Sequence, residues 1–196
     1  MAAAIIPPDL KEPDQRHRLS RAEYDNLLGS GIFGEQRLEL LAGELINKMG
    51  QKPAHSYVIQ LLQILLTRIF GARRVMVQRP VEVSDEYSLP EPDLAVIPEF
   101  TAEYAIRFPH ARELSLLIEV ADTSLRQDTT IKRDLYARAG VSTYWVIDIP
   151  RRRVILYQAP ESGAFQVAVV LEETERLEVE GTVIPVSDIL PPRDDG

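Results

Sequence analysis

The stretch Leu116-Leu117-Ile118-Glu119-Val120-Ala121 places one glutamate inside an otherwise apolar run. The run predicts a strand with both faces buried, where an unpaired carboxylate costs on the order of several kcal/mol. A second carboxylate, Asp93, follows Pro92 and begins another apolar run, Leu94-Ala95-Val96-Ile97. Each acid therefore needs a partner, and two of them facing one cleft would favour a divalent cation.

The sequence around these two runs contains many strand patterns and few helical ones. Runs rich in β-branched residues predict strands at 75–83, 94–97, 115–121, 143–149, 154–158 and 165–172. A single helix is predicted between them, at about 127–139, and Gly140 follows it where a left-handed residue commonly ends a helix. The fold class is therefore α/β (α+β), with a central mixed β-sheet flanked by helices.

The N-terminal part adds a helix, a hairpin and a second helix. Ser20 stands three residues before Glu23, the spacing of a capping box, and predicts a short helix at 21–28. Strand patterns at 37–41 and 44–48 flank Ala42-Gly43, which predicts a β-hairpin. Apolar residues at spacings of three and four between 56 and 70 predict a helix that packs on the sheet.

The composition is typical of a single globular domain. The chain has 196 residues, 45% of them hydrophobic and 27% charged. We expect a flexible arm at 1–18, one domain at 19–190 and a tail at 191–196. The absence of cysteine excludes disulfides and thiolate zinc sites and fits a cytoplasmic location. No stretch reads as a secretory signal or a membrane span, so no membrane association is expected.

The net charge of −8 argues against a general nucleic-acid coat protein, because binding phosphates requires clustered basic residues. The negative charge is concentrated after residue 160, where nine acidic residues accompany two arginines. A local basic cleft remains possible in the rest of the chain. Its candidate members are Arg73, Arg74, Arg79, Arg126, Lys132 and Arg133.

The two strand carboxylates suit magnesium or manganese. Magnesium is typically bound through one or two protein carboxylates, with water and substrate phosphate completing the shell, so Asp93 and Glu119 would suffice. The carbonyl of Val120 could supply a third oxygen. On the helix that follows, Asp128, Lys132 and Tyr136 recur every four residues on one face. The Lys132 ammonium could orient a water molecule and offset phosphate charge.

Structural interpretations compete with each of these roles. Asp128 and Lys132 are also spaced as an ordinary helical ion pair, Asp93 could be a turn residue, and Glu119 could form a structural salt bridge. His55 is expected to be a partly exposed residue at a helix start. Glu39, on the strand face opposite its leucine neighbours, is expected to be exposed, with an auxiliary acidic role as the alternative. Trp145 is expected to pack in the core.

Together these residues resemble the Uma2 family, also named DUF820, which is placed among the restriction-endonuclease-like PD-(D/E)XK folds. The resemblance extends from about Ser20 to Ile189 and includes the hairpin with Glu39 and the helix start at His55. The order and spacing of the motifs carry it, no single motif being specific. The central motifs are Pro92-Asp93, Glu119-Val120, Lys132, Tyr136, Gly140 and Tyr144-Trp145-Val146-Ile147-Asp148.

The resemblance implies a metal-dependent nuclease with Asp93 and Glu119 as metal ligands and Lys132 as the catalytic lysine. The usual lysine position, two residues after the strand acid, is Ala121 here, so the lysine function would have moved to the helix. The expected activity is a Mg²⁺- or Mn²⁺-dependent endonuclease acting on DNA as a homodimer. The alternatives are a binding protein on the same fold, or a nuclease that acts on RNA.

Overall fold

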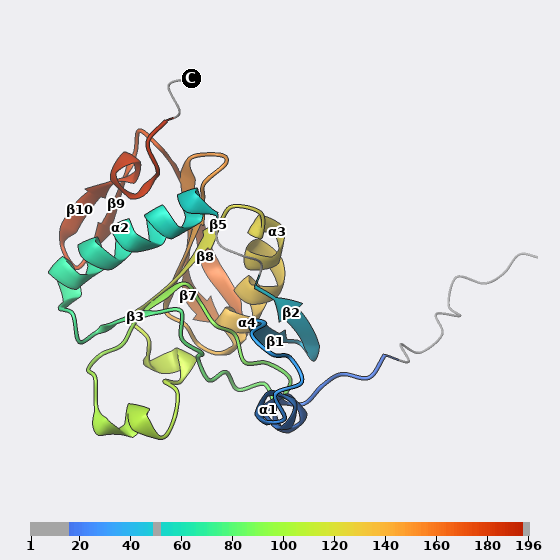
Figure 1. Ribbon diagram of the computed structural model, residues 1–196. Helices are drawn as coiled ribbons and strands as arrows, with labels where there is room; N and C mark the ends of the chain where they lie inside the picture. Colours follow the sequence, from blue (N-terminus) through green and yellow to red (C-terminus); the bar gives the residue numbers. More distant parts are fainter. Residues whose placement is uncertain (1–15, 49–51, 194–196) are drawn as a thin grey trace, which may run out of the picture.

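The computed structural model describes residues 16–48 and 52–193 and is built around a six-stranded sheet (Figure 1). The strand order is β3-β4-β5-β6-β7-β8, with β5 and β6 parallel and every other neighbouring pair antiparallel. The predicted central mixed sheet is therefore confirmed. The strands are β3 (Val75–Val77), β4 (Leu94–Val96), β5 (Leu116–Ala121), β6 (Thr143–Asp148), β7 (Arg153–Glu161) and β8 (Ala164–Glu172).

The parallel pair β5 and β6 requires a crossover, which a helical segment supplies. This segment consists of α3 (Leu125–Gln127), a π-helical turn (Asp128–Lys132) and α4 (Arg133–Arg138). One regular helix at about 127–139 was predicted, and the π turn interrupts it. Such a turn commonly marks a functional site, and here it ends at the buried Lys132. Gly140 has the left-handed φ of 81° expected after the helix.

The helix predicted at 56–70 is confirmed as α2 (Pro53–Phe70), which crosses one face of the sheet (Figure 1). It begins three residues earlier than predicted, because proline is readily accommodated in the first turn. The side chains of Val58, Leu62 and Leu66 are fully buried and join Ile118 and Trp145 in one hydrophobic cluster. The predicted core position of Trp145 is thus confirmed.

The crossover helix α4 covers the opposite face. Tyr136 of α4 packs edge-on against Tyr144 of β6, with ring centroids 5.1 Å apart. Leu117 and Val146 belong to the same cluster, so β5 and β6 are covered on both sides. This arrangement explains why the β5 run is apolar at every position except Glu119.

The predicted N-terminal helix and hairpin are confirmed as α1 (Arg21–Gly29), β1 (Leu38–Leu41) and β2 (Glu44–Asn47). Ser20 and Glu23 form the capping box in both directions. Ala42 and Gly43 both have positive φ, as a two-residue hairpin turn requires. The backbone N–H of Leu89 donates to the Leu40 carbonyl at 2.8 Å, which attaches β1 beside the segment that leads to β4.

Three further differences separate the predicted elements from the observed ones. The strand predicted at 75–83 ends at Val77, because Gln78 adopts a φ of 50° that no strand continues. The loop after β4 contains two short 3₁₀ turns, η1 (Ala102–Ala105) and η2 (Ala111–Glu113). In the acidic C-terminal part, β9 (Arg176–Val179) and β10 (Thr182–Pro185) form an unpredicted hairpin, followed by η4 (Val186–Ile189).

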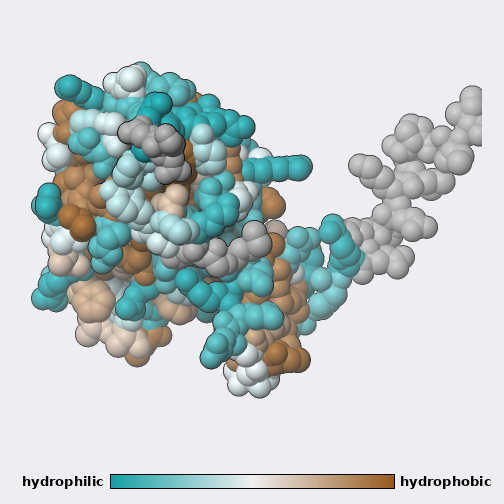
Figure 2. All heavy atoms as spheres, turned by 45° about the horizontal axis from the view of Figure 1, so that its top comes forward, coloured by the Kyte–Doolittle hydropathy of each residue, from teal (hydrophilic) through white to brown (hydrophobic). Residues whose placement is uncertain are grey.

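The surface combines charged and apolar residues. On the face in Figure 2, hydrophobic atoms form several groups among hydrophilic ones rather than one continuous patch. No helix within residues 16–48 and 52–193 is long and apolar enough to cross a membrane. Most of the arm predicted at 1–18 lies outside the described residues. Of its described residues, 16–18, the Arg18 side chain donates to the Ala42 carbonyl at 2.8 Å.

Candidate active site

A cavity of about 270 Å³ opens where the β1–β2 hairpin, the start of α2, the end of β5 and the crossover segment meet. Seven of the eight candidate residues line it, and the eighth, Tyr136, contacts one of them. Elements far apart in the sequence therefore bring the candidates together. The seven are Glu39, His55, Asp93, Glu119, Val120, Asp128 and Lys132.

Asp93 immediately precedes β4 and is held by contacts from three other segments. Its Oδ2 accepts a hydrogen bond from the Val120 N–H at 2.9 Å and lies 3.3 Å from His55 Nε2. Gln78 Nε2 donates to Oδ1 at 3.4 Å. Burial alone would raise the pKa of Asp93, but the His55 hydrogen bond and the Lys48 charge outweigh it and lower the pKa to about 2. Asp93 is therefore a carboxylate at neutral pH.

Glu119 of β5 accepts two hydrogen bonds on the same oxygen. Lys132 Nζ donates to Oε1 at 2.9 Å and the Tyr136 hydroxyl at 2.8 Å. Burial raises the pKa of Glu119 to about 8, against the opposing effect of the Lys132 charge. The contact with Lys132 that the structural interpretation of Glu119 predicted is thus present, as a hydrogen bond in the wall of the cavity.

The Lys132 ammonium lies among three acidic side chains. It is 2.9 Å from Glu119 Oε1, 3.1 Å from Glu39 Oε1 and 4.0 Å from Asp128 Oδ1. Burial would lower the pKa of Lys132, but these three acids raise it well above its usual value. Lys132 is therefore charged. The helical pair with Asp128, which the sequence alone favoured, is the longest of its three contacts.

Glu39 corrects an expectation from the sequence. It was expected to be exposed, but only 3% of the residue is accessible. Its Oε1 faces Lys132, and its Oε2 accepts the Glu91 N–H at 3.1 Å. Alternation along β1 does direct Glu39 away from Leu40. The strand face that carries Glu39, however, lines the cavity instead of facing solvent.

His55 occupies the first turn of α2, as predicted, and its side chain is 16% exposed. Its Nε2 faces Asp93, whereas its buried Nδ1 has no hydrogen-bond partner among the described residues. The start of α2 thus fixes the imidazole against the candidate ligand Asp93. This contact goes beyond the role of an ordinary helix-start residue.

The proposed basic cleft is not formed as expected. Of its six candidates, only Lys132 lines the cavity, and Arg73 and Arg79 line a different one. The other cations in the wall of the cavity are Arg37, Lys48 and Lys52, which the sequence reasoning missed. These residues lie around the hairpin and the start of α2, and no local pattern distinguishes them from surface cations.

The donor set agrees with a hard divalent cation held by few protein ligands. Asp93 and Glu119 line the same cavity, and each carries a carboxyl group. Within residues 16–48 and 52–193, no group of three or more histidine and acidic side chains is arranged to hold a metal by itself. Magnesium typically needs only one or two carboxylates and retains several waters. The residues present therefore fit such an ion, with water and substrate as its remaining ligands.

Comparison with known proteins agrees with this architecture. The model of the Uma2 family, described as putative restriction endonucleases, matches residues 21–187. The chain belongs to the Uma2 family. The crystal structure of a putative nuclease of DUF820 from Anabaena variabilis is similar to this Uma2 protein, with a TM-score of 0.69 and 18% identity over 87% of this chain and 97% of that chain. No curated protein matches the sequence.

The family resemblance and the fold predicted from the motifs are thereby confirmed. For this Uma2 protein, the structural neighbour shows the fold, while the geometry of the cavity is a property of its own residues. Ala121 occupies the position where the usual motif has lysine, and it is fully buried. Lys132 nevertheless reaches Glu119 from the crossover segment.

Proposed function

We propose that this Uma2 protein is a Mg²⁺- or Mn²⁺-dependent endonuclease that hydrolyses phosphodiester bonds in DNA. The observation that carries the proposal is the convergence of Asp93, Glu119 and Lys132 on one cavity. Membership in a family of putative restriction endonucleases supports the reaction class. Asp93 and Glu119 would hold the ion, and the backbone carbonyl of Val120 is the candidate third ligand.

A bound divalent cation would lower the pKa of a water molecule and offset the negative charge that develops on the scissile phosphate. The protein residues would position the reacting groups. His55 and the Val120 N–H fix one Asp93 oxygen, and Tyr136 with Lys132 fixes one Glu119 oxygen. Side chains fixed in this way do not need to reorganise when substrate arrives. A bound cation would favour the ionised form of Glu119.

Lys132 would be the electrostatic partner of the phosphate. Its ammonium is charged, almost fully buried and surrounded by acidic side chains. A phosphate oxygen that entered the cavity would therefore meet a poorly hydrated cation. Glu39 would hold this ammonium from the hairpin side. In this proposal Asp128 and Glu39 are positioning residues, because they act through Lys132.

A homodimer would provide the two active centres that cleavage of both strands of a duplex requires. The measurement for this part of the proposal is the molar mass in solution by light scattering. If the protein is a monomer and nicks only one strand, the nuclease proposal stands and the dimer proposal is rejected. A dimer is expected to linearise plasmid DNA.

The experiment for the reaction compares Mn²⁺, Mg²⁺ and EDTA on supercoiled DNA, linear duplex, single-stranded DNA and single-stranded RNA. The proposal expects cleavage of DNA with either metal and none with EDTA. Cleavage of RNA but not DNA would show that the same residues act on RNA, since metal-assisted hydrolysis does not distinguish the sugar.

The competing function is a binding protein that has the nuclease fold without cleavage. Calorimetry separates the two functions, because a working centre should bind Mn²⁺ in a way that Asp93→Ala abolishes. Absence of both metal binding and cleavage in the folded wild-type protein would favour the binding protein.

A further inference from the structure

A second cavity, of about 460 Å³, lies between β3 and the loop that carries η1. Its wall combines arginines with phenylalanine and tyrosine rings, and the first cavity has no such rings among its lining residues. The residues that matter here are Arg73, Arg79, Arg107, Phe100, Tyr104 and Phe108.

Two of the three arginines have no acidic partner in the described part of the chain. Arg79 is exposed, and Arg73 donates only to the Phe100 carbonyl, at 3.3 Å. Arg107 differs, because Glu103 and Glu113 hold its guanidinium at 2.7 and 3.1 Å. In a chain with a net charge of −8, this cavity wall therefore carries two arginines whose charge no described acid neutralises.

The rings in the same wall are partly accessible. Phe100 is 48% exposed, and its centroid lies 6.0 Å from that of Tyr104. The Arg107 guanidinium lies over the other ring, 5.2 Å from the Tyr104 centroid. Arg107 thus fixes Tyr104 in place, while Phe100 remains available. An exposed ring beside free arginines is the arrangement on which unpaired nucleobases stack.

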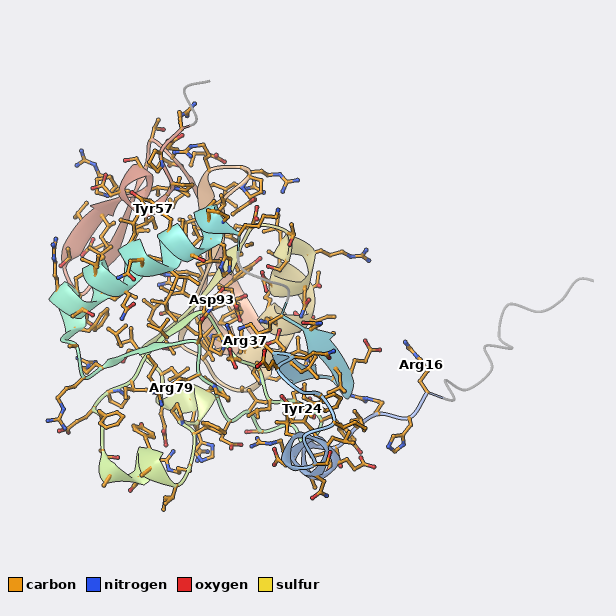
Figure 3. The ribbon with its side chains drawn as sticks, in the orientation of Figure 1. Arg16, Tyr24, Arg37, Tyr57, Arg79 and Asp93 are labelled. Carbon is orange, nitrogen blue, oxygen red and sulfur yellow. The ribbon has the colours of Figure 1, made fainter. Side chains whose placement is uncertain are left out.

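The second cavity adjoins the first through two consecutive residues. Gln78 lines the first cavity and donates to Asp93, whereas Arg79 lines the second. Their Cα atoms are separated by one peptide unit, about 3.8 Å. Figure 3 shows Arg79 on the side of Asp93 that faces the η1 loop. A strand that leaves the first cavity past Gln78 would therefore meet Arg79.

We propose that the second cavity binds single-stranded nucleic acid next to the cleavage position. Unpaired bases stack on Phe100, and Arg73 and Arg79 contact the phosphates. The path from one cavity to the other rests on the proposed function, whereas the binding itself requires no cleavage. The two claims can therefore fail separately.

The test is fluorescence anisotropy with a labelled oligothymidylate of roughly 15 nucleotides in EDTA, where metal-dependent cleavage cannot occur. Arg79→Ala and Phe100→Ala are each expected to raise Kd by about tenfold. Phe100→Tyr should restore binding, because it keeps a ring. Arg176→Ala in β9 is the control, since this exposed arginine lines neither cavity.

The outcomes discriminate between the claims once circular dichroism shows that each variant is folded. Weak binding by the wild type, or unchanged Kd in both alanine variants, would overturn the proposal. The proposal would also be overturned if a duplex of the same length bound as tightly as the single strand and if both alanine variants weakened duplex binding equally. That result would favour duplex binding. If the wild type binds the oligonucleotide tightly, the alanine variants bind it weakly and no cleavage occurs in Mn²⁺, the binding site is supported and the nuclease activity is rejected.

Discussion

Lys132 Nζ lies 2.9 Å from Glu119 Oε1, although the two residues belong to different elements and the usual motif places its lysine on the same strand as the acid. The crossover segment between β5 and β6 brings them together, and its π turn ends at Lys132. The ammonium is thus delivered to the strand acid from the helix. This contact is the basis of the proposed centre.

Removal of the lysine charge should destabilise the protein as well as inactivate it. Lys132→Met would leave Glu119 and Glu39 buried without their cation, which we expect to lower the free energy of unfolding by about 3–5 kcal/mol. Urea denaturation measures this change. The matched control is Lys52→Met, since Lys52 is 61% exposed and its pair with Asp122 should contribute less than about 1 kcal/mol. Equal stability of the two variants would contradict the expected role of Lys132.

The buried Glu119 should make stability depend on pH. Its pKa is raised from 4.5 in the unfolded chain to about 8 in the native state, so the native state retains a proton over that interval. This contribution to stability is complete below 4.5 and is lost as pH rises toward 8. Relative to Glu119→Gln, which does not titrate there, the wild type should therefore become less stable over this range.

The comparison requires EDTA, so that no metal occupies the cavity, and urea denaturation at several pH values. A free-energy difference between wild type and Glu119→Gln that stays constant from pH 5 to pH 8 would show that Glu119 does not titrate in this range. Titrating groups remote from Glu119 cancel, because their surroundings are the same in both proteins.

His55 should control the acidity of Asp93. Burial alone would raise the pKa of Asp93, and the His55 hydrogen bond is the largest influence that lowers it to about 2. His55→Leu removes the donor at similar size, so the pKa of Asp93 should rise. Carbon-13 NMR of the Asp93 carboxyl group measures it, with Gln78→Leu as the comparison, expected to have a smaller effect. An unchanged Asp93 titration in His55→Leu would refute this role.

Local signals in the sequence predicted the fold well. The Ser20–Glu23 capping box, the Ala42-Gly43 turn and the α2 stripe each depend on residues close in sequence, and all three are present. The β9–β10 hairpin was missed because its strands are short and charged residues interrupt their apolar ones. The π turn was missed because residues 128–136 also suit a regular helix.

The site was only partly predictable. The isolated carboxylates Asp93 and Glu119 were visible because they interrupt apolar runs. Glu39 was misjudged, since alternation gives the face of a strand but not what covers it. No local sequence signal marked Lys48 or Gln78 as site residues. Their positions in the cavity wall depend on how the ends of β2 and β3 are placed in the fold.

The proposed roles of Asp93 and Glu119 are tested by the rate at which the purified protein nicks supercoiled plasmid in Mn²⁺, measured for the wild type, Asp93→Asn and Glu119→Gln. Asp134→Asn is the control, because Asp134 pairs with Arg133 outside the cavity. We expect cleavage by the wild type and the control, and at least a hundredfold loss, on the order of one oxyanion-type contact, in both site variants. Equal cleavage by folded Asp93→Asn and wild type would contradict these roles.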